Sequence, residues 1–349
     1  MSLSMEMAER RWLPDSLVRY GIRRLDRRRL AEIRQPEGPA LEKAEERFVD
    51  AMRQSPVAMN TREANQQHYE LPPEFFEAVL GRHMKYSCGF WLEGTVSLDQ
   101  AEEEMLGLTA ERAALSDGQS ILELGCGWGS LSLWMAKQFP NSKITSVSNS
   151  KPQKEFIDSR LRRLGIDNLK VITSDMNAFE IDARFDRVVS VEMFEHMRNW
   201  PLLLQRIDSW LKLGGKFFMH IFTHRKFSYT FEVEGEDAWM GRYFFTGGMM
   251  PSDDLICRIQ DHLEVEKHWR LNGRHYQKTA EAWLTNMDVE EKKILPIMQN
   301  VYGDRDARRW LQRWRIFFMA VAELWGFNQG DEWLVSHYLL QKKGDGNEG

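Results

Sequence analysis

The sequence has few cysteines, little net charge and no long apolar run. Its three cysteines, Cys88, Cys126 and Cys257, are odd in number and widely spaced, which argues against a disulfide framework and predicts free thiols in a reducing, cytoplasmic setting. A formal charge of −5 over 349 residues argues against general nucleic-acid binding. No apolar run is long enough to span a membrane, and residues 1–11 are too polar for a signal peptide. The apolar content of 42% is nevertheless enough for a full core.

Arginine is the local exception to this even charge. The stretch RRWLPDSLVRYGIRRLDRRRLAEIR places Leu17, Val18, Ile22 and Leu25 at helical spacing. Such a helix could touch anionic lipid, or it could be solvated by its arginines and pack on its own domain or on a partner subunit. The apolar stripe is short and acids are interleaved, so packing is favoured and contact with a membrane surface stays the alternative.

From Ser120 onward, apolar β-type runs alternate with helical stretches, which is typical of a parallel sheet flanked by helices. The segments RQPEGPA and FSYTFEVEGEDAWMGRYFFTGGMMP interrupt this texture on either side, while EVEKHWRL and WLVSHYLLQKK predict late strands. The expected divisions are a helical N-terminal extension (1–66), a Rossmann-like core (67–222), a cap or substrate-binding insertion with a late strand (223–330), and a final strand with a disordered tail (331–349).

A glycine turn, G-C-G-W-G, follows the predicted strand 120–124 and precedes a predicted helix. Gly125, Gly127 and Gly129 would let the backbone approach a ligand closely. The spacing differs from the G-x-G-x-x-G of dinucleotide-binding turns. Glu123, just before the turn, suits a ligand with a cationic amine, and the molecule that joins a nucleoside to an amino-acid cation is S-adenosylmethionine.

Two later strand ends fit the same ligand. The second strand ends in SVSNS, so Asn149 and Ser150 stand where an acid commonly holds ribose hydroxyls. Asp175, which follows the third strand, could accept a hydrogen bond from an adenine amino group or could equally cap a helix.

With these residues assembled, the chain resembles one branch of class I methyltransferases: the cyclopropane fatty acid synthases and the related coclaurine N-methyltransferases. The resemblance runs from about Gln67 to Lys343 and rests on the motifs HYELPPEFF, MKYSCGFW, LELGCGWGSLSLWMAKQFPNSKITSVSNSKPQKEFI, VEMFEHMRNW, HIFTHRKFSY and NQGDEWLVSHYLLQKK. It implies a mostly parallel seven-stranded α/β sheet and a dimer as a plausible assembly. It also implies cofactor contacts at Tyr69, Ser87, Gly125, Gly127, Asn149, Gln153 and Asp175, to which the neighbouring Met176 is added.

The prediction of the methyl acceptor depends mainly on the motif VEMFEHM. The lipid enzymes usually have glycine where this chain has Glu192, whereas the coclaurine-type enzymes have glutamate, so the resemblance favours a small hydrophobic amine. Tyr276 matches the lipid enzymes instead. Cys88, Glu195 and His220 resemble positions that hold bicarbonate in those enzymes, but Phe222 replaces a smaller isoleucine there.

Three acceptor hypotheses therefore stand. The favoured one is amine N-methylation; the alternative is transfer of a one-carbon unit to an unsaturated acyl chain, and only this alternative uses bicarbonate. A binding protein without chemistry is the third.

The expected chemistry of amine methylation assigns roles to three residues. Glu192 would orient the substrate ammonium, while Glu195 and His196 would share the role of base. Helical spacing would bring the two glutamates to one side, at the strand end where open α/β sheets bind ligands. His196 could instead cap the helix expected near residue 199.

Aromatic side chains are dense in the cap (residues 227–245) and in a late helix (310–325), where they could wall an apolar amine pocket or simply pack. His220 and His224 stand four apart without a completing acid or cysteine, so no metal site is expected.

Overall fold

The structure is a computed structural model that describes residues 3–34, 38–59, 71–231 and 238–343. Tyr69 and the predicted disordered tail from residue 344 onward lie outside the described residues.

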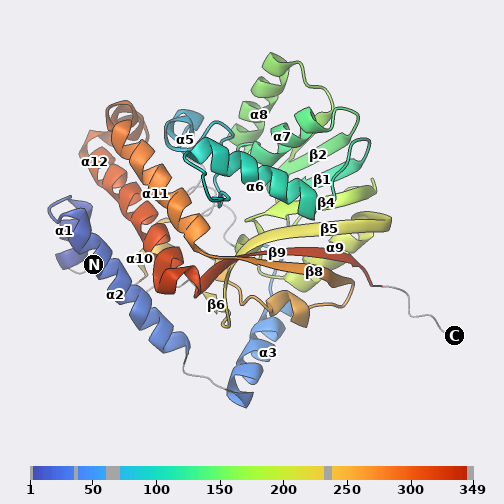
Figure 1. Cartoon of the computed structure of the whole chain (residues 1–349), viewed down its shortest axis with the longest axis horizontal. Helices are drawn as coiled ribbons and strands as arrows, with labels where there is room; N and C mark the ends of the chain where they lie inside the picture. The colour runs from blue at the N-terminus through green and yellow to red at the C-terminus, as the bar shows by residue number, and fades with distance from the viewer. Residues whose placement is uncertain (1–2, 35–37, 60–70, 232–237, 344–349) are drawn as a thin grey trace.

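A twisted seven-stranded sheet forms the centre of the fold (Figure 1). Its spatial order is β3-β2-β1-β4-β5-β9-β8, and β9 runs antiparallel to both of its neighbours. The strands are β1 (Ser120–Leu124), β2 (Lys143–Ser148), β3 (Leu169–Thr173), β4 (Phe185–Val191), β5 (Leu211–His224), β8 (Leu263–Leu271) and β9 (Trp333–Lys342). The predicted class I methyltransferase sheet, including its two late strands, is confirmed.

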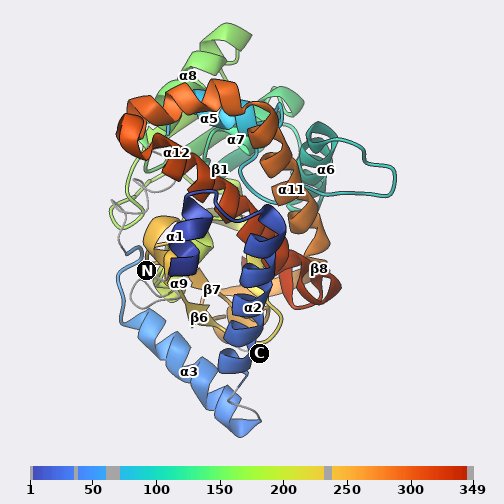
Figure 2. The same ribbon diagram turned by 90° about the vertical axis from the view of Figure 1, so that its left-hand side faces the viewer.

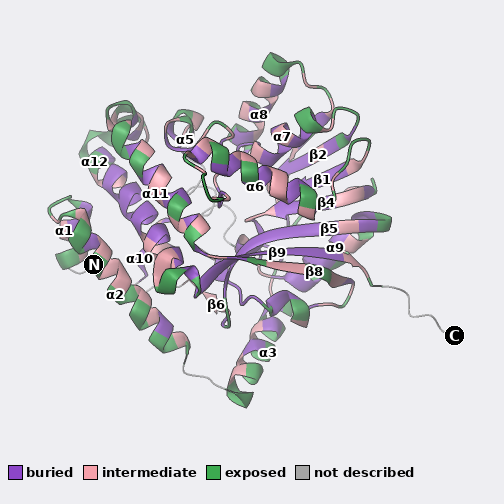
Figure 3. Cartoon of the chain, in the orientation of Figure 1, coloured by how far each residue is buried: buried purple, intermediate pink, exposed green. Residues whose placement is uncertain are grey.

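Helices cover both faces of this sheet. One face packs under α6 (Leu98–Arg112), α7 (Ser130–Gln138) and α8 (Lys151–Leu164). The other face packs against α9 (Trp200–Trp210) and α3 (Pro39–Arg53). The central strands are buried on both faces, as Figure 3 shows, which explains their near-continuous apolar sequences.

A helical lobe lies beside the sheet (Figures 1 and 2). Its apolar core joins aromatic and aliphatic side chains from segments that are far apart in the chain. The elements are α1 (Leu3–Glu9), α2 (Asp15–Ile33), α5 (Pro73–Val79), α11 (Arg274–Val289) and α12 (Glu291–Gly326), with the shorter pieces β6 (Tyr229–Thr230), α10 (Trp239–Tyr243), β7 (Met249–Met250) and η3 (Phe327–Gly330). Two further short helices, η1 (Phe194–His196) and η2 (Leu255–Arg258), pack into the core that the sheet forms with α9 and α3.

The arginine-rich helix α2 packs along α12 (Figure 2). Arg19 forms ion pairs with Glu281 (2.6 Å) and Glu323 (3.0 Å), and Arg23 also pairs with Glu323 (2.9 Å). Val18 is buried beneath the helix. The favoured expectation, a helix that packs on its own domain, is confirmed. No helix in the described part of the chain has the length and apolar character needed to cross a membrane.

Candidate active site

The glycine turn joins β1 to α7 in a backbone conformation that favours glycine. Gly125 has φ 80° and Gly129 has φ 81°. A Cβ on Gly125 would lie 2.6 Å from the side chain of Met193, and one on Gly129 would lie 2.7 Å from Ile157. The turn is also held by the carbonyl of Val147, which accepts from the N–H groups of Gly125 and Cys126 at 3.0 Å. Glycine is thus required here both by conformation and by space.

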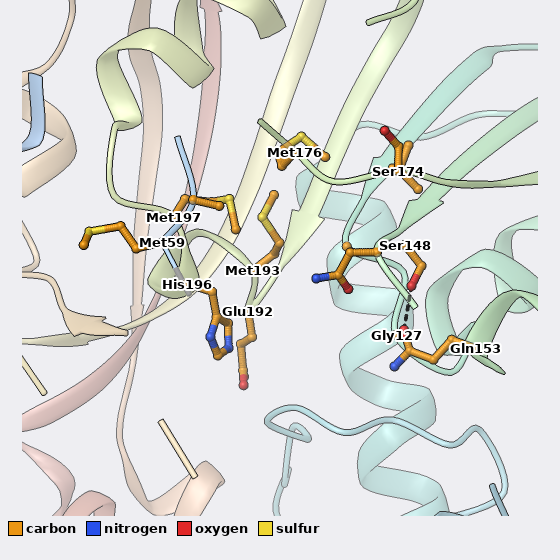
Figure 4. A pocket seen from close by; sticks show the side chains of 14 residues that line it. Met59, Gly127, Ser148, Gln153, Ser174, Met176, Glu192, Met193, His196 and Met197 are labelled. Atoms are coloured by element: carbon orange, nitrogen blue, oxygen red, sulfur yellow. Dashed lines mark hydrogen bonds between the residues drawn. The ribbon is translucent and has the colours of Figure 1, made fainter. Parts of the chain in front are cut away.

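A pocket opens where this turn meets the carboxyl ends of β2 and β4 (Figure 4). Methionine side chains gather on one side of it, and Ser148 with Gln153 lies on the other. The Oγ of Ser148 donates to Gln153 Oε1 at 2.7 Å, while Gln153 Nε2 is buried and has no hydrogen-bond partner among the described residues. The lining residues are Ala58, Met59, Gly125, Gly127, Val147, Ser148, Asn149, Gln153, Ser174, Met176, Glu192, Met193, His196 and Met197.

Five of the predicted cofactor residues line this pocket: Gly125, Gly127, Asn149, Gln153 and Met176. Ser87 and Asp175 are not among its lining residues. Ser87 accepts a hydrogen bond from Lys85 Nζ at 2.5 Å, and Asp175 accepts one from the N–H of Asn177 at 2.8 Å. The residues that directly follow Asp175, up to β4, form a turn and irregular backbone, so this contact closes a turn and the alternative of a helix cap is wrong.

Glu123 needs a correction. We expected its carboxylate to meet a cationic ligand, but the side chain turns away from the pocket, where the hydroxyls of Ser132 and Ser146 donate to it. The reason is the alternation of strand β1, which places Glu123 on the same face as Ile121, under α7. Burial raises the pKa of Glu123 to about 7. Its contacts tie β1 to β2 and α7 and thereby support the glycine turn.

Glu192 is the centre of the polar network beside the pocket. Its Oε1 accepts from the backbone N–H of Cys88 at 2.8 Å and lies 3.1 Å from His220 Nε2, while its Oε2 accepts from the hydroxyl of Tyr276 at 2.6 Å. Burial raises the pKa of Glu192, and the nearby cation of Lys85 opposes that shift. The backbone of Glu192 has φ 47°, in the left-handed region that non-glycine residues rarely adopt.

Glu195 and His196 follow Glu192 on the short helix η1. Glu195 Oε1 accepts from the N–H of Phe222 at 2.7 Å, and its Oε2 is buried without a partner among the described residues. Burial and the adjacent Glu192 raise the pKa of Glu195 well above its usual range, so both favour its neutral form. Burial lowers the pKa of His196 to about 4, so its imidazole is neutral and can accept a proton.

The structure adds a residue that the sequence reasoning missed. Lys85 is buried, donates to Ser87 Oγ and to the carbonyl of Cys88 at 2.8 Å, and its charge acts on Glu192. A lysine inside the apolar motif MKYSCGFW was the available signal, because lysine is rarely buried without a partner. His220 is buried too, and its ring lies 4.4 Å from that of His337.

A second, apolar cavity lies on the other side of this network. It reaches from Tyr276 and Phe245 to helix α2 and has about 1300 Å³ of empty space, including its open mouth. Its aromatic walls come from the predicted cap (Tyr229, Phe231, Trp239 and Phe245), the late helix (Phe317 and Trp325), β5 (Phe222) and α11 (Tyr276). Other aromatics of the same segments, such as Phe244 and Trp314, are fully buried and simply pack. Some aromatics of these segments therefore line a cavity and others pack in the core; that the cavity holds an amine stays a prediction.

The two cavities meet at the acids. Glu192 and His196 line the first pocket, whereas Tyr276, which donates to Glu192, lines the second. The ring of His196 lies 4.6 Å from that of Phe245, and Glu195 contacts the backbone of Phe222. A molecule in each cavity would face the other across this junction.

A glycine turn at the end of the first strand of this sheet, opening on a nucleoside-sized pocket, defines a class I S-adenosylmethionine-dependent methyltransferase. The family model described as mycolic acid cyclopropane synthetase matches residues 58–325, and the chain belongs to this family.

Individual relatives are similar over most of their length. The chain is 37% identical to (S)-coclaurine N-methyltransferase of Thalictrum flavum subsp. glaucum, over 85% of this chain and 83% of the relative. It is 28% identical to the cyclopropane-fatty-acyl-phospholipid synthase of Escherichia coli (strain K12), over 74% of this chain and 68% of the relative. A crystal structure of coclaurine N-methyltransferase bound to N-methylheliamine and SAH superposes with a TM-score of 0.93 at 33% identity, covering 97% of this chain and 98% of that one.

The described pocket fits S-adenosylmethionine as the methyl donor. The glycine turn leaves room for close approach of a ligand, and the orphaned Nε2 of Gln153 is a buried donor that needs an acceptor. The methionine side chains supply an apolar surface that suits a purine ring.

Proposed function

We propose that this protein methylates the nitrogen of a small, hydrophobic secondary or tertiary amine, with an alkaloid-like ring system as the class of acceptor. The observation that carries the proposal is the position of the Glu192 carboxylate between the two cavities. Cys88 N–H and the Tyr276 hydroxyl donate to it, and His220 Nε2 lies beside it. An acid held in this way, next to an aromatic cavity, suits a ligand that arrives as an ammonium ion.

The same observation argues against the lipid alternative. Cys88 and His220 belong to the set that the resemblance associates with bicarbonate, and here both contact a carboxylate that the protein itself supplies, as does Tyr276, which matches the tyrosine of the lipid enzymes. Phe222 is also bulkier than the isoleucine of the lipid enzymes. The site therefore has its own anion where the lipid route needs a dissolved one, and bicarbonate has no evident place. Relatives named as coclaurine and pavine N-methyltransferases support the amine acceptor.

The residues of the two cavities have different proposed roles, which follow from their position and charge. When bound, S-adenosylmethionine supplies a methyl group on a positively charged sulfur. We assign the donor's cradle to Gly125, Gly127, Asn149, Gln153 and Met176, with Tyr69, Ser87 and Asp175 kept as further predicted contacts.

On the acceptor side, Glu192 attracts and orients the ammonium by charge, and neutral His196 accepts the proton that must leave before the nitrogen has a lone pair. Burial raises the pKa of Glu195 in the empty site, whereas a cation beside it would lower that pKa and favour the ionised carboxylate, which stabilises the cation. The apolar walls exclude water and align the acceptor for in-line displacement.

The experiment offers the purified chain a methyl-labelled donor together with a panel of secondary amines or with unsaturated phospholipid vesicles. Label in the amines supports the proposal, label in the lipid supports the alternative, and no label in either supports a binding protein without chemistry. Glu192→Ala and His196→Ala should each lower turnover while leaving calorimetric affinity for S-adenosylhomocysteine close to wild type. Glu104→Gln, at an exposed acid of α6, is the matched control. A loss of cofactor affinity without a separate turnover defect would show that the roles are misplaced.

Two further expectations belong to the proposal. We propose a reducing, cytoplasmic setting, because Cys88, Cys126 and Cys257 are all unpaired and two of them are buried. Cell fractionation tests this directly. A homodimer is proposed from the resemblance, and light scattering on the purified chain tests it.

A further inference from the structure

Helix α2 places a carboxyl group at the end of the apolar cavity that is remote from Glu192. Asp26 lines this cavity, and its Oδ2 is inaccessible to solvent and has no hydrogen-bond partner among the described residues. An unpaired buried oxygen costs free energy that a ligand with a matching donor would recover. The mechanism proposed above makes no use of this group.

The charged side chains around Asp26 do not offset the effect of its burial. Glu323 opposes its ionisation, and of the two arginines that favour ionisation, Arg23 is already paired with Glu323 at 2.9 Å and Arg27 is exposed. Burial accordingly raises the pKa of Asp26 to about 8. A neutral carboxyl can donate a hydrogen bond through its O–H and accept one through its carbonyl oxygen, and a hydroxyl group can pair with both.

We propose that Asp26 determines substrate specificity by hydrogen bonding to a hydroxyl group on the ring of the amine that lies farthest from the nitrogen. This inference rests on the proposed function, since the amine nitrogen must stand at Glu192 and His196 for the remote ring to reach α2. The cavity supports that pose because one set of walls, from Tyr276 to Phe231 and Trp239, connects the two ends.

Other ligand groups fit this end less well. A second ammonium would stand near Arg28 and Arg29, which line the cavity beside Asp26. A carboxylate or phosphate would face Asp26 and Glu32. A methyl ether offers no proton to the unpaired oxygen. A hydroxyl meets the donor requirement without adding charge.

The test uses three probe amines: a benzyl-substituted tetrahydroisoquinoline, its analogue with a hydroxyl on the benzyl ring, and the corresponding methyl ether. Wild type should show kcat/KM about tenfold higher for the hydroxyl compound than for the unsubstituted one, the size expected for one hydrogen bond. Asp26→Leu should abolish this preference while turnover of the unsubstituted amine stays within about twofold of wild type. Asp26→Asn, which keeps the size of the side chain and still offers an acceptor and a donor, should keep most of the preference and guards against misfolding of the leucine variant. Glu104→Gln, at an exposed acid of α6 that does not line the cavity, is the control and should keep the full preference.

Calorimetric binding of the same amines to protein loaded with S-adenosylhomocysteine separates the two proposals. If wild type binds the hydroxyl compound more tightly but methylates none of the three, the proposed function fails and the role of Asp26 stands. If all are methylated and both Asp26 variants keep the wild-type preference, or lose activity equally for all three amines, the inference is overturned.

Discussion

The carboxyl of Asp26 makes a quantitative prediction about stability, because a group kept for binding should weaken the empty fold. Its pKa is raised from 3.8 to about 8 on folding, mainly by burial. Below pH 3.8 Asp26 is protonated in both the native and the unfolded state, and the full free energy of unfolding is present. As the pH rises from 3.8 to 8, only the unfolded state releases the proton, and stability is lost. At pH 7 the native state therefore holds a proton that the unfolded chain has released.

The magnitude follows from that difference. About three pH units separate 3.8 from 7, and each is worth about 1.4 kcal/mol, so the cost at pH 7 is about 4 kcal/mol at most. A rotation of the side chain toward the pocket mouth would lower this cost, and we expect Asp26→Asn to raise the free energy of unfolding by about 1–4 kcal/mol. Burial sets the sign of the shift; Glu323 adds to it, and Arg27 and Arg23 oppose it.

Urea unfolding followed by tryptophan fluorescence measures this effect. The gap in unfolding free energy between Asp26→Asn and wild type should widen between about pH 5 and about pH 8, by up to about 1.4 kcal/mol per pH unit. Glu32→Gln, at an exposed position of α2, should show no such widening. A gap that is independent of pH, or a variant less stable than wild type at pH 7, would refute the reasoning.

Three further predictions concern the junction and the glycine turn. Glu192→Gly should lower amine methylation about 100-fold, and the backbone should tolerate the change because φ 47° suits glycine. Millimolar bicarbonate should restore part of the activity, because the three polar groups that surround the carboxylate remain. Activity that does not respond to bicarbonate would contradict this. Tyr276→Phe removes a hydrogen bond that lowers the pKa of Glu192, so turnover should fall about tenfold at neutral pH and the acidic limb of kcat/KM should move to higher pH; an unmoved limb would separate the hydroxyl from catalysis. Gly125→Ala places a Cβ 2.6 Å from Met193 and should weaken binding of S-adenosylhomocysteine, measured by calorimetry, more than tenfold. Gly94→Ala, also at positive φ but in open space, is the control and should lower only stability. Equal losses of affinity in the two variants would refute the steric account.

Secondary structure in the sheet could be predicted closely because it depends on local sequence. The runs 120–124, 143–148 and 169–173 are apolar and β-branched, and the observed strands have the same bounds. The boundary between two elements was harder to predict: α9 ends at Trp210 and β5 begins at Leu211, which pairs with Phe185. That pairing joins residues distant in the chain, so local periodicity could not reveal it.

The side of its strand or helix on which an individual acidic side chain lies was harder to predict. Glu123 was expected in the pocket, although strict alternation along its strand would have placed it under α7 beside Ile121. Asp26 carried a similar signal, since it follows Ile22 by four residues and so lies on the apolar stripe of α2. An acid on a stripe that faces the interior indicates either a partner or a ligand.

The sequence by itself determined the order of strands and helices, the conformation of the glycine turn and the motif that carries Glu192, because each depends on neighbours within a few residues. Only the tertiary structure brought Cys88, His220 and Tyr276 to one carboxylate and placed Asp26 at the far end of the apolar cavity. Contacts of that kind depend on how separate elements pack. Packing, in turn, sets the burial that raises the pKa of Glu195 and keeps His196 neutral, and so decides what the site can do.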